Sequence, residues 1–146
     1  MAQTFKPRLG IGLSFSALAL LYSVMLVGVY VTSSHQGLTC PDWPLCPNGF
    51  SFPAAKYLFE FVHRLMVVIA VGVIIATAIY CLRNVKPARK TALLGALVAG
   101  LQIFFGYLTV TFKLPPLLVA AHLSTGITLF AMMLMTLLAT YKATKP

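Results

Sequence analysis

Two histidines, His63 and His122, are the residues of this sequence best suited to hold a metal cofactor. Each stands in a long apolar run, seven residues after Lys56 and six after Pro116 respectively. At about 1.5 Å of rise per residue, both imidazoles would lie roughly 9–10 Å below the outer ends of their helices. Neutral imidazole is a common ligand of haem iron, and facing side chains in bundle cores build such sites. The matched depth favours a haem held between the two histidines, and the alternative is that each imidazole only hydrogen-bonds within the bundle.

Glu60 and Arg64 share a helix face with His63, because the three residues occupy positions i, i+3 and i+4. Glu60 is the acid that falls inside an apolar run. One interpretation is an i, i+4 ion pair that lowers the cost of burying both charges. The other makes Glu60 a base or charge stabiliser beside a cofactor, because a carboxyl in a low-dielectric pocket can be tuned. Arg64 could instead meet an anionic group such as a haem propionate.

Cys40 and Cys46 are separated by five residues in a polar loop between two apolar runs. If this loop lies on the oxidising side of a membrane, the two cysteines are expected to form a disulfide. The bond would either staple the loop over the bundle or exchange electrons with an outside partner. A zinc site that includes His35 is disfavoured, because structural zinc takes four ligands.

Gly106 lies seven residues before Lys113, at about the depth of the two histidines. A glycine at that level would let a cofactor ring approach the backbone closely. The alternative is ordinary packing of small residues between membrane helices.

The composition shows what kind of chain must position these residues. Of 146 residues, 60% are hydrophobic and 9% are charged. Soluble domains have about 25% charged and 45–50% apolar residues. A soluble enzyme and a disordered chain are therefore excluded. The net charge of +9 does not indicate a nucleic-acid partner, because the basic residues lie in short gaps between apolar runs, as in membrane proteins.

The apolar runs predict an all-α polytopic membrane protein with four spanning helices in a lipid bilayer, since about 20 apolar residues suffice for one span. The first helix is expected to remain as an anchor rather than to be cleaved. The whole chain, 1–146, is predicted to be a single domain, with helices at about 9–32, 57–82, 91–112 and 116–141.

The basic residues predict the orientation of the helices, because short cytoplasmic loops carry an excess of lysine and arginine. Eight basic residues fall on the side of the two termini and three on the other side. Both termini are therefore expected in the cytoplasm, and the Cys40–Cys46 loop outside a cell membrane. The eight are Lys6, Arg8, Arg83, Lys86, Arg89, Lys90, Lys142 and Lys145, and the three are Lys56, Arg64 and Lys113.

Three motifs together resemble the haem A synthase family. They are the loop GLTCPDWPLC at 37–46, the EFVHR motif at 60–64, and the run LQIFFGYLTV at 101–110 followed by Leu114-Pro115 and His122-Leu123. The cysteine loop is the most specific of the three. They occur in the order found in that family and cover about residues 37 to 123.

The resemblance implies an oxidoreductase that oxidises a ring methyl group of haem O through an alcohol to a formyl group, giving haem A for terminal oxidases. In that case His63 and His122 would be axial ligands of the haem iron, and Glu60 would assist the oxidation. Water would supply the oxygen, and an electron acceptor would take the electrons. Cys40 and Cys46 would form a disulfide that serves electron transfer or shapes the haem pocket.

Typical members of that family have eight spanning helices in two similar halves, whereas this sequence predicts one half. The second haem site is then absent or supplied by another copy, which favours a homo-oligomer. A haem O synthase is a further expected partner. One alternative function is a bis-histidine membrane cytochrome with haem b, which would need neither Glu60 nor the cysteine loop. Another is a small proton-coupled transporter that uses the intramembrane carboxylate.

Overall fold

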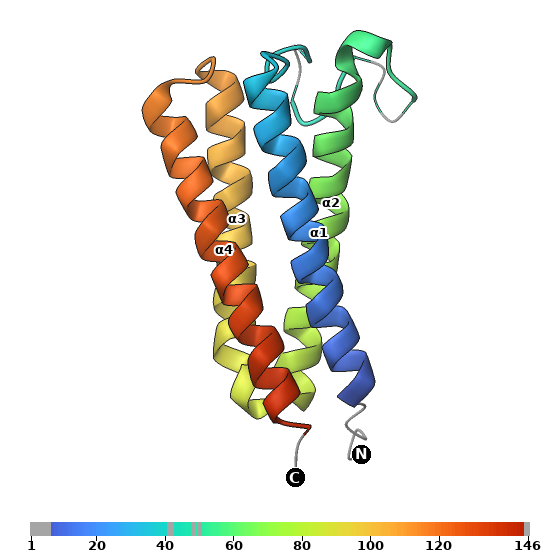
Figure 1. Cartoon of the computed structure of the whole chain (residues 1–146), viewed down its shortest axis with the longest axis vertical. Helices are drawn as coiled ribbons and strands as arrows, with labels where there is room; N and C mark the ends of the chain where they lie inside the picture. Colours follow the sequence, from blue (N-terminus) through green and yellow to red (C-terminus); the bar gives the residue numbers. More distant parts are fainter. Residues whose placement is uncertain (1–6, 41–42, 48, 50, 145–146) are drawn as a thin grey trace.

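A computed structural model describes residues 7–40, 43–47, 49 and 51–144 of the chain. Its regular structure is helical, which confirms the predicted all-α class for the described residues (Figure 1). Short 3-10 turns precede the second and third helices. The elements are α1 (Pro7–Ser33), η1 (Ala55–Tyr57), α2 (Leu58–Asn84), η2 (Lys86–Ala88), α3 (Arg89–Thr111) and α4 (Pro116–Lys142).

All four long helices are apolar and long enough to cross a membrane, as predicted. They contain 23 to 27 residues, or about 35–40 Å of helix against a hydrocarbon core of about 30 Å. The observed ends differ from the predicted ones by a few residues. For example, α1 begins at Pro7, because a proline in the first helical turn loses no hydrogen bond. Similarly, α2 continues through Arg83, whose charge suits a helix C-terminus.

The helices pack as two hairpins. The most extensive contacts join α1 to α2 and α3 to α4, and the hairpins meet where α1 packs on α4 and α2 on α3 (Figure 1). The four helices therefore form a ring. In such a ring α2 and α4, which carry the two histidines, lie on a diagonal and face each other across the centre.

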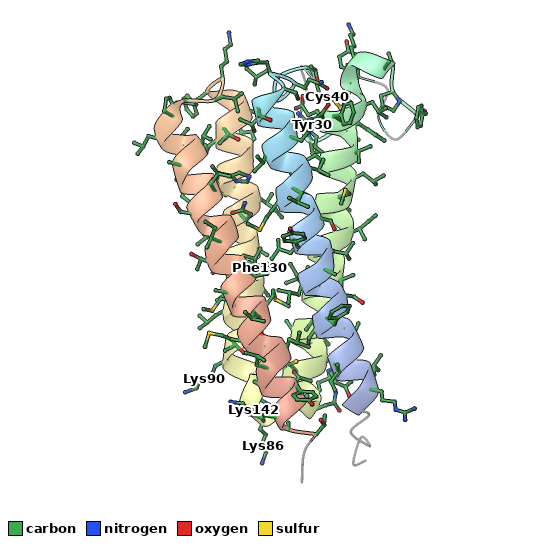
Figure 2. The ribbon with its side chains drawn as sticks, in the orientation of Figure 1. Tyr30, Cys40, Lys86, Lys90, Phe130 and Lys142 are labelled. Carbon is green, nitrogen blue, oxygen red and sulfur yellow. A yellow bond between two sulfur atoms is a disulfide. The ribbon has the colours of Figure 1, made fainter. Side chains whose placement is uncertain are left out.

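The two ends of the bundle differ in charge. The loop between α1 and α2, with Cys40, lies at one end, and Lys86, Lys90 and Lys142 lie at the other (Figure 2). The start of α1 and the end of α4 are both at the lysine-bearing end (Figure 1). Lys6 and Lys145, which contribute to the orientation argument, lie outside the described residues. The end with Cys40 is called the loop end below.

The hydrophobic core occupies the middle and the lysine-bearing end of the bundle. One buried cluster in the middle combines side chains from all four helices: Ala17, Leu21, Ile74, Ala99, Leu129 and Met133. A second buried cluster lies nearer the lysine-bearing end: Ala78, Cys81, Val85, Ala88 and Ala92. Neither cluster includes a residue near the histidines.

Candidate functional site

His63 and His122 lie at the same level of the bundle, as predicted. His63 is five residues into α2 and His122 is six residues into α4, and both helices begin at the loop end. Gly28 and Gly106 occupy the same level, since each stands five residues before the end of its helix. The four residues thus form one layer, which we call the histidine layer, about 8–9 Å from the loop ends of the helices.

Each histidine lies against a glycine of the preceding helix. A Cβ atom placed on Gly28 would lie 2.8 Å from Cε1 of His63, and one on Gly106 would lie 3.3 Å from Cε1 of His122. The first distance is too short for any real side chain. Gly106 therefore accommodates the imidazole of His122, and the approach of a cofactor ring to this glycine stays a prediction. Gly28 was not predicted, although its distance from the helix end is the same as that of Gly106.

The two imidazoles are positioned similarly in the two hairpins. His63 interacts with the backbone of Val24, four residues before Gly28. His122 interacts with the backbone of Gln102, four residues before Gly106. The two rings are also close enough to interact electrostatically. Each hairpin therefore holds its imidazole against the backbone of the preceding helix in the same way.

Both imidazoles keep a ring nitrogen without a partner. Nδ1 of His63 and Nδ1 of His122 are buried and accept or donate no hydrogen bond within the described residues. Buried polar atoms in proteins are nearly always paired, so two such atoms in one layer call for an explanation. The interpretation that each histidine only hydrogen-bonds within the bundle leaves these nitrogens unexplained.

The histidine layer is also the level at which the helices bury no residue. Farther toward the lysine-bearing end, the bundle is closed by its hydrophobic core. At the histidine layer the side chains of the four helices are half-buried or exposed rather than buried. The stretches without a buried residue are 25–30 of α1, 61–69 of α2, 100–108 of α3 and 116–125 of α4.

Glu60, one turn from His63 toward the loop end, binds the cysteine loop. It is 3% exposed. Its Oε2 accepts hydrogen bonds from the backbone N–H of Cys40 and from Oγ1 of Thr39, both at 2.9 Å. Its Oε1 pairs with Nη2 of Arg64, which confirms the predicted i, i+4 ion pair. The carboxylate therefore anchors the loop to α2, a role that spacing along the helix did not indicate.

Arg64 binds the same loop from its other end. Its Nη1 donates to the carbonyl oxygens of Pro44 and Leu45, both at 3.2 Å. These contacts direct the guanidinium toward the loop. A contact of Arg64 with a haem propionate stays a prediction, as does a catalytic role for Glu60.

Cys40 and Cys46 form the predicted disulfide, with Cα atoms 4.9 Å apart. Pro41 and Asp42, between them, lie outside the described residues. The loop reaches the opposite hairpin, because the ring of Trp43 packs edge-on against Tyr107 of α3, with centroids 5.1 Å apart. The loop therefore joins the two hairpins above the histidine layer.

The remaining candidates are separate from this site. His35 is exposed at the end of α1, and Cys81 is a buried free thiol near the lysine-bearing end. Within the described residues, no three His, Cys, Asp or Glu side chains gather in a way that could hold a metal ion. The arrangement that the layer offers is thus a pair of imidazoles, which is the ligand set of a bis-histidine haem.

Comparisons with known proteins agree with this arrangement. The family model described as cytochrome oxidase assembly protein matches residues 50–146. A haem A synthase of Shewanella oneidensis is 30% identical over 80% of this chain and 41% of its own length. A haem A synthase of Bacillus pumilus is 30% identical over 84% of this chain and 42% of its own length.

A protohaem IX farnesyltransferase of Haloarcula marismortui is also similar, at 31% identity over 75% of this chain and 24% of its own length. The chain spans about two fifths of the length of the two haem A synthases. The family match and these identities confirm the resemblance seen in the three motifs. The chain belongs to the haem A synthase family.

Proposed function

We propose that this protein binds haem O in the histidine layer and oxidises one of its ring methyl groups to a formyl group, giving haem A. The observation that carries the proposal is the pair of imidazoles on diagonal helices. They lie at one depth, each has a buried ring nitrogen without a hydrogen-bond partner, and the stretches of helix around them bury no residue. Membership of the haem A synthase family supports the same substrate class.

The residues of the layer fit a haem for three reasons. Both imidazoles can turn a nitrogen toward an iron between them, and two imidazoles complete six-coordinate iron. Gly28 and Gly106 let the two rings lie close to the backbone of their own hairpins. The side chains at this level are mostly apolar, as the porphyrin face and an isoprenoid tail require.

The reaction replaces two C–H bonds of the methyl carbon by a C=O bond. One water molecule supplies the oxygen, and four protons and four electrons leave in two stages, through an alcohol. His63 and His122 would fix the ring relative to α2. Glu60, one turn away on the same helix, is the buried carboxylate nearest in sequence to a ligand. It would accept a proton or stabilise positive charge developing at the methyl carbon, which fixed charges do well in a dry site.

The hydrogen bonds of Glu60 affect how it could act as a proton acceptor. Its Oε2 is occupied by Thr39 and Cys40, and its Oε1 by Arg64. A carboxylate has about four acceptor sites, so these three hydrogen bonds leave one site on Oε1 for a proton. Protonation would weaken the ion pair with Arg64, which also binds the disulfide loop, so the loop and the reaction would be coupled.

The orientation of the bundle in the membrane and the partners of the protein are part of the same proposal. The lysine-bearing end would face the cytoplasm of a cell membrane and the disulfide loop would lie outside. A second copy of the chain would supply the half that the longer relatives contain. An enzyme that attaches the tail to haem would be a partner. The similarity to part of a protohaem IX farnesyltransferase supports that pairing. A further partner would be an acceptor for the four electrons that leave in the reaction.

The decisive experiment supplies haem O to membranes that contain the protein and measures haem alcohol and haem A by extraction. The parent is compared with Glu60→Gln, which keeps the size of the side chain and one acceptor oxygen. We expect product from the parent, and haem O without product from Glu60→Gln. A parent that binds haem but extracts with only unmodified haem b would instead be a bis-histidine cytochrome. A parent that binds no haem would overturn the proposal.

A further inference from the structure

The side chain of Gln102 lies between α3 and α4, beside His122. Its Nε2 is 3.3 Å from Nε2 of the imidazole. Gly126, one turn beyond His122 on α4, makes room for it, because a Cβ atom there would lie 3.2 Å from the same amide nitrogen. Gln102 is thus the side chain that hydrogen-bonds to one of the two candidate ligands.

This contact is made in one of the two neutral tautomers of His122. When the proton is on Nδ1, Nε2 can accept from the amide nitrogen of Gln102, and the same Nε2 lone pair can bind a metal.

The same two residues also leave two complementary atoms unpaired. Oε1 of Gln102 and Nδ1 of His122 are both buried without a hydrogen-bond partner. The first is an acceptor, and in the tautomer protonated on Nδ1 the second is a donor. Metal-bound histidines almost always donate their second N–H to an oxygen, which fixes the ring and makes it a more basic ligand.

We propose that Gln102 is a positioning residue for His122. Nε2 of the imidazole would bind the haem iron in place of the amide nitrogen of Gln102. Oε1 of Gln102 would then accept a hydrogen bond from Nδ1–H of the imidazole. The inference rests on the proposed haem site. The proposed hydrogen bond makes the two ligands unequal in basicity. The residue that corresponds to Gln102 beside His63 is Val24, which has no side-chain acceptor. His122 is the more basic ligand of the pair.

The test uses the full chain in detergent, loaded with haem b as the probe. Three variants are compared with the parent. Gln102→Met removes the amide at similar size, Gln102→Glu keeps an acceptor oxygen, and Gln36→Met makes the same chemical change in the loop region, away from the imidazoles. The measurements are the reduction potential of the bound haem and its rate of transfer to apomyoglobin.

We expect Gln102→Met to raise the reduction potential, because a less basic imidazole stabilises ferric iron less. It should also speed haem loss by about tenfold or more, as removal of an outer-shell partner usually does. Gln102→Glu should hold the potential at or below that of the parent, and Gln36→Met should match the parent in both measurements.

Two results would overturn the inference while leaving the haem site intact. One is a Gln102→Met protein with the parent's potential and rate of haem loss. The other is a rise in potential for Gln102→Glu as large as that for Gln102→Met, which would mean that only packing was lost. A parent that takes up no haem b would overturn the proposed function and this inference with it.

Discussion

The backbone N–H of Cys40 donates a hydrogen bond to Oε2 of Glu60 at 2.9 Å, across twenty residues of sequence. One end of the disulfide is thereby tied to the acid that lies one turn from His63. Thr39 and Arg64 complete the shell of that carboxylate. The acid, the disulfide loop and the candidate ligand of α2 therefore form one connected unit.

This unit predicts unequal effects of two substitutions on stability. Thr39→Ala removes one hydrogen bond to the charged carboxylate and should lower the free energy of unfolding by about 1.5–3 kcal/mol. Glu60→Ala leaves Arg64 without its carboxylate partner, and breaking such a buried pair costs about 3–5 kcal/mol. Denaturant unfolding in detergent would measure both. Equal losses for the two variants would show that the carboxylate does not anchor the loop.

The two imidazoles are expected to be equally necessary for low-spin haem. His63→Ala and His122→Ala each remove one axial ligand, so each variant should lose the low-spin absorption spectrum and retain at most a five-coordinate haem. Absorption spectra of the ferric and ferrous proteins would show this. An unchanged spectrum in either variant would exclude that residue as a ligand.

The contact between Gly28 and His63 predicts that a single methyl group will disturb the site. In Gly28→Ala the new Cβ would lie 2.8 Å from the imidazole, so the ring must move. We expect weaker haem binding and a loss of stability of about 1–3 kcal/mol, as in other overpacked sites. Gly106→Ala should have a smaller effect of the same kind, because its distance is 3.3 Å.

The same helices provide matched controls. A Cβ atom on Gly12 of α1 or on Gly100 of α3 would meet no atom within 4 Å. Gly12→Ala and Gly100→Ala should therefore leave haem binding unchanged, with stability unchanged or raised by up to about 1 kcal/mol, because alanine favours a helix over glycine. If the control variants lose haem as Gly28→Ala does, contact with the imidazole is not the cause.

The disulfide is expected to stabilise the loop without being required for haem binding. Replacing both Cys40 and Cys46 by serine should lower the free energy of unfolding by about 2 kcal/mol, because the loop loses its covalent closure. Glu60 and Arg64 would still bind the backbone of the loop, so the haem spectrum should persist. Loss of the spectrum in this double variant would mean that the disulfide shapes the haem pocket directly.

The orientation of the bundle can be tested with single cysteines at exposed positions. Lys113→Cys lies in the turn between α3 and α4, and Lys142→Cys lies at the opposite end. In intact cells, a membrane-impermeant maleimide should label Lys113→Cys and should label Lys142→Cys only after permeabilisation. The native Cys81 is buried and should stay unlabelled. The reverse pattern would contradict the sidedness derived from the basic residues.

Much of the fold follows from the sequence because its signals are local. A run of apolar residues determines a span by its length alone, and a constant rise per residue converts sequence position into depth. That is why the four helices and the common level of His63 and His122 were predicted correctly, and why the spacing offered a Glu60–Arg64 ion pair as one of two interpretations. The pairing of Cys40 with Cys46 followed from the expected position of their loop on the oxidising side of the membrane.

The tertiary structure decided which helix faces touch. In a membrane the lipid is as apolar as a leucine side chain, so hydrophobic pattern alone does not say which face of a helix meets a neighbour. Only packing places α2 and α4 on a diagonal and sets Gly28 against His63. The same packing brings the oxygens of Glu60 to the amide of Cys40 and the carboxamide of Gln102 to His122. These contacts join residues 20 to 35 positions apart, and no periodicity within a single helix encodes them.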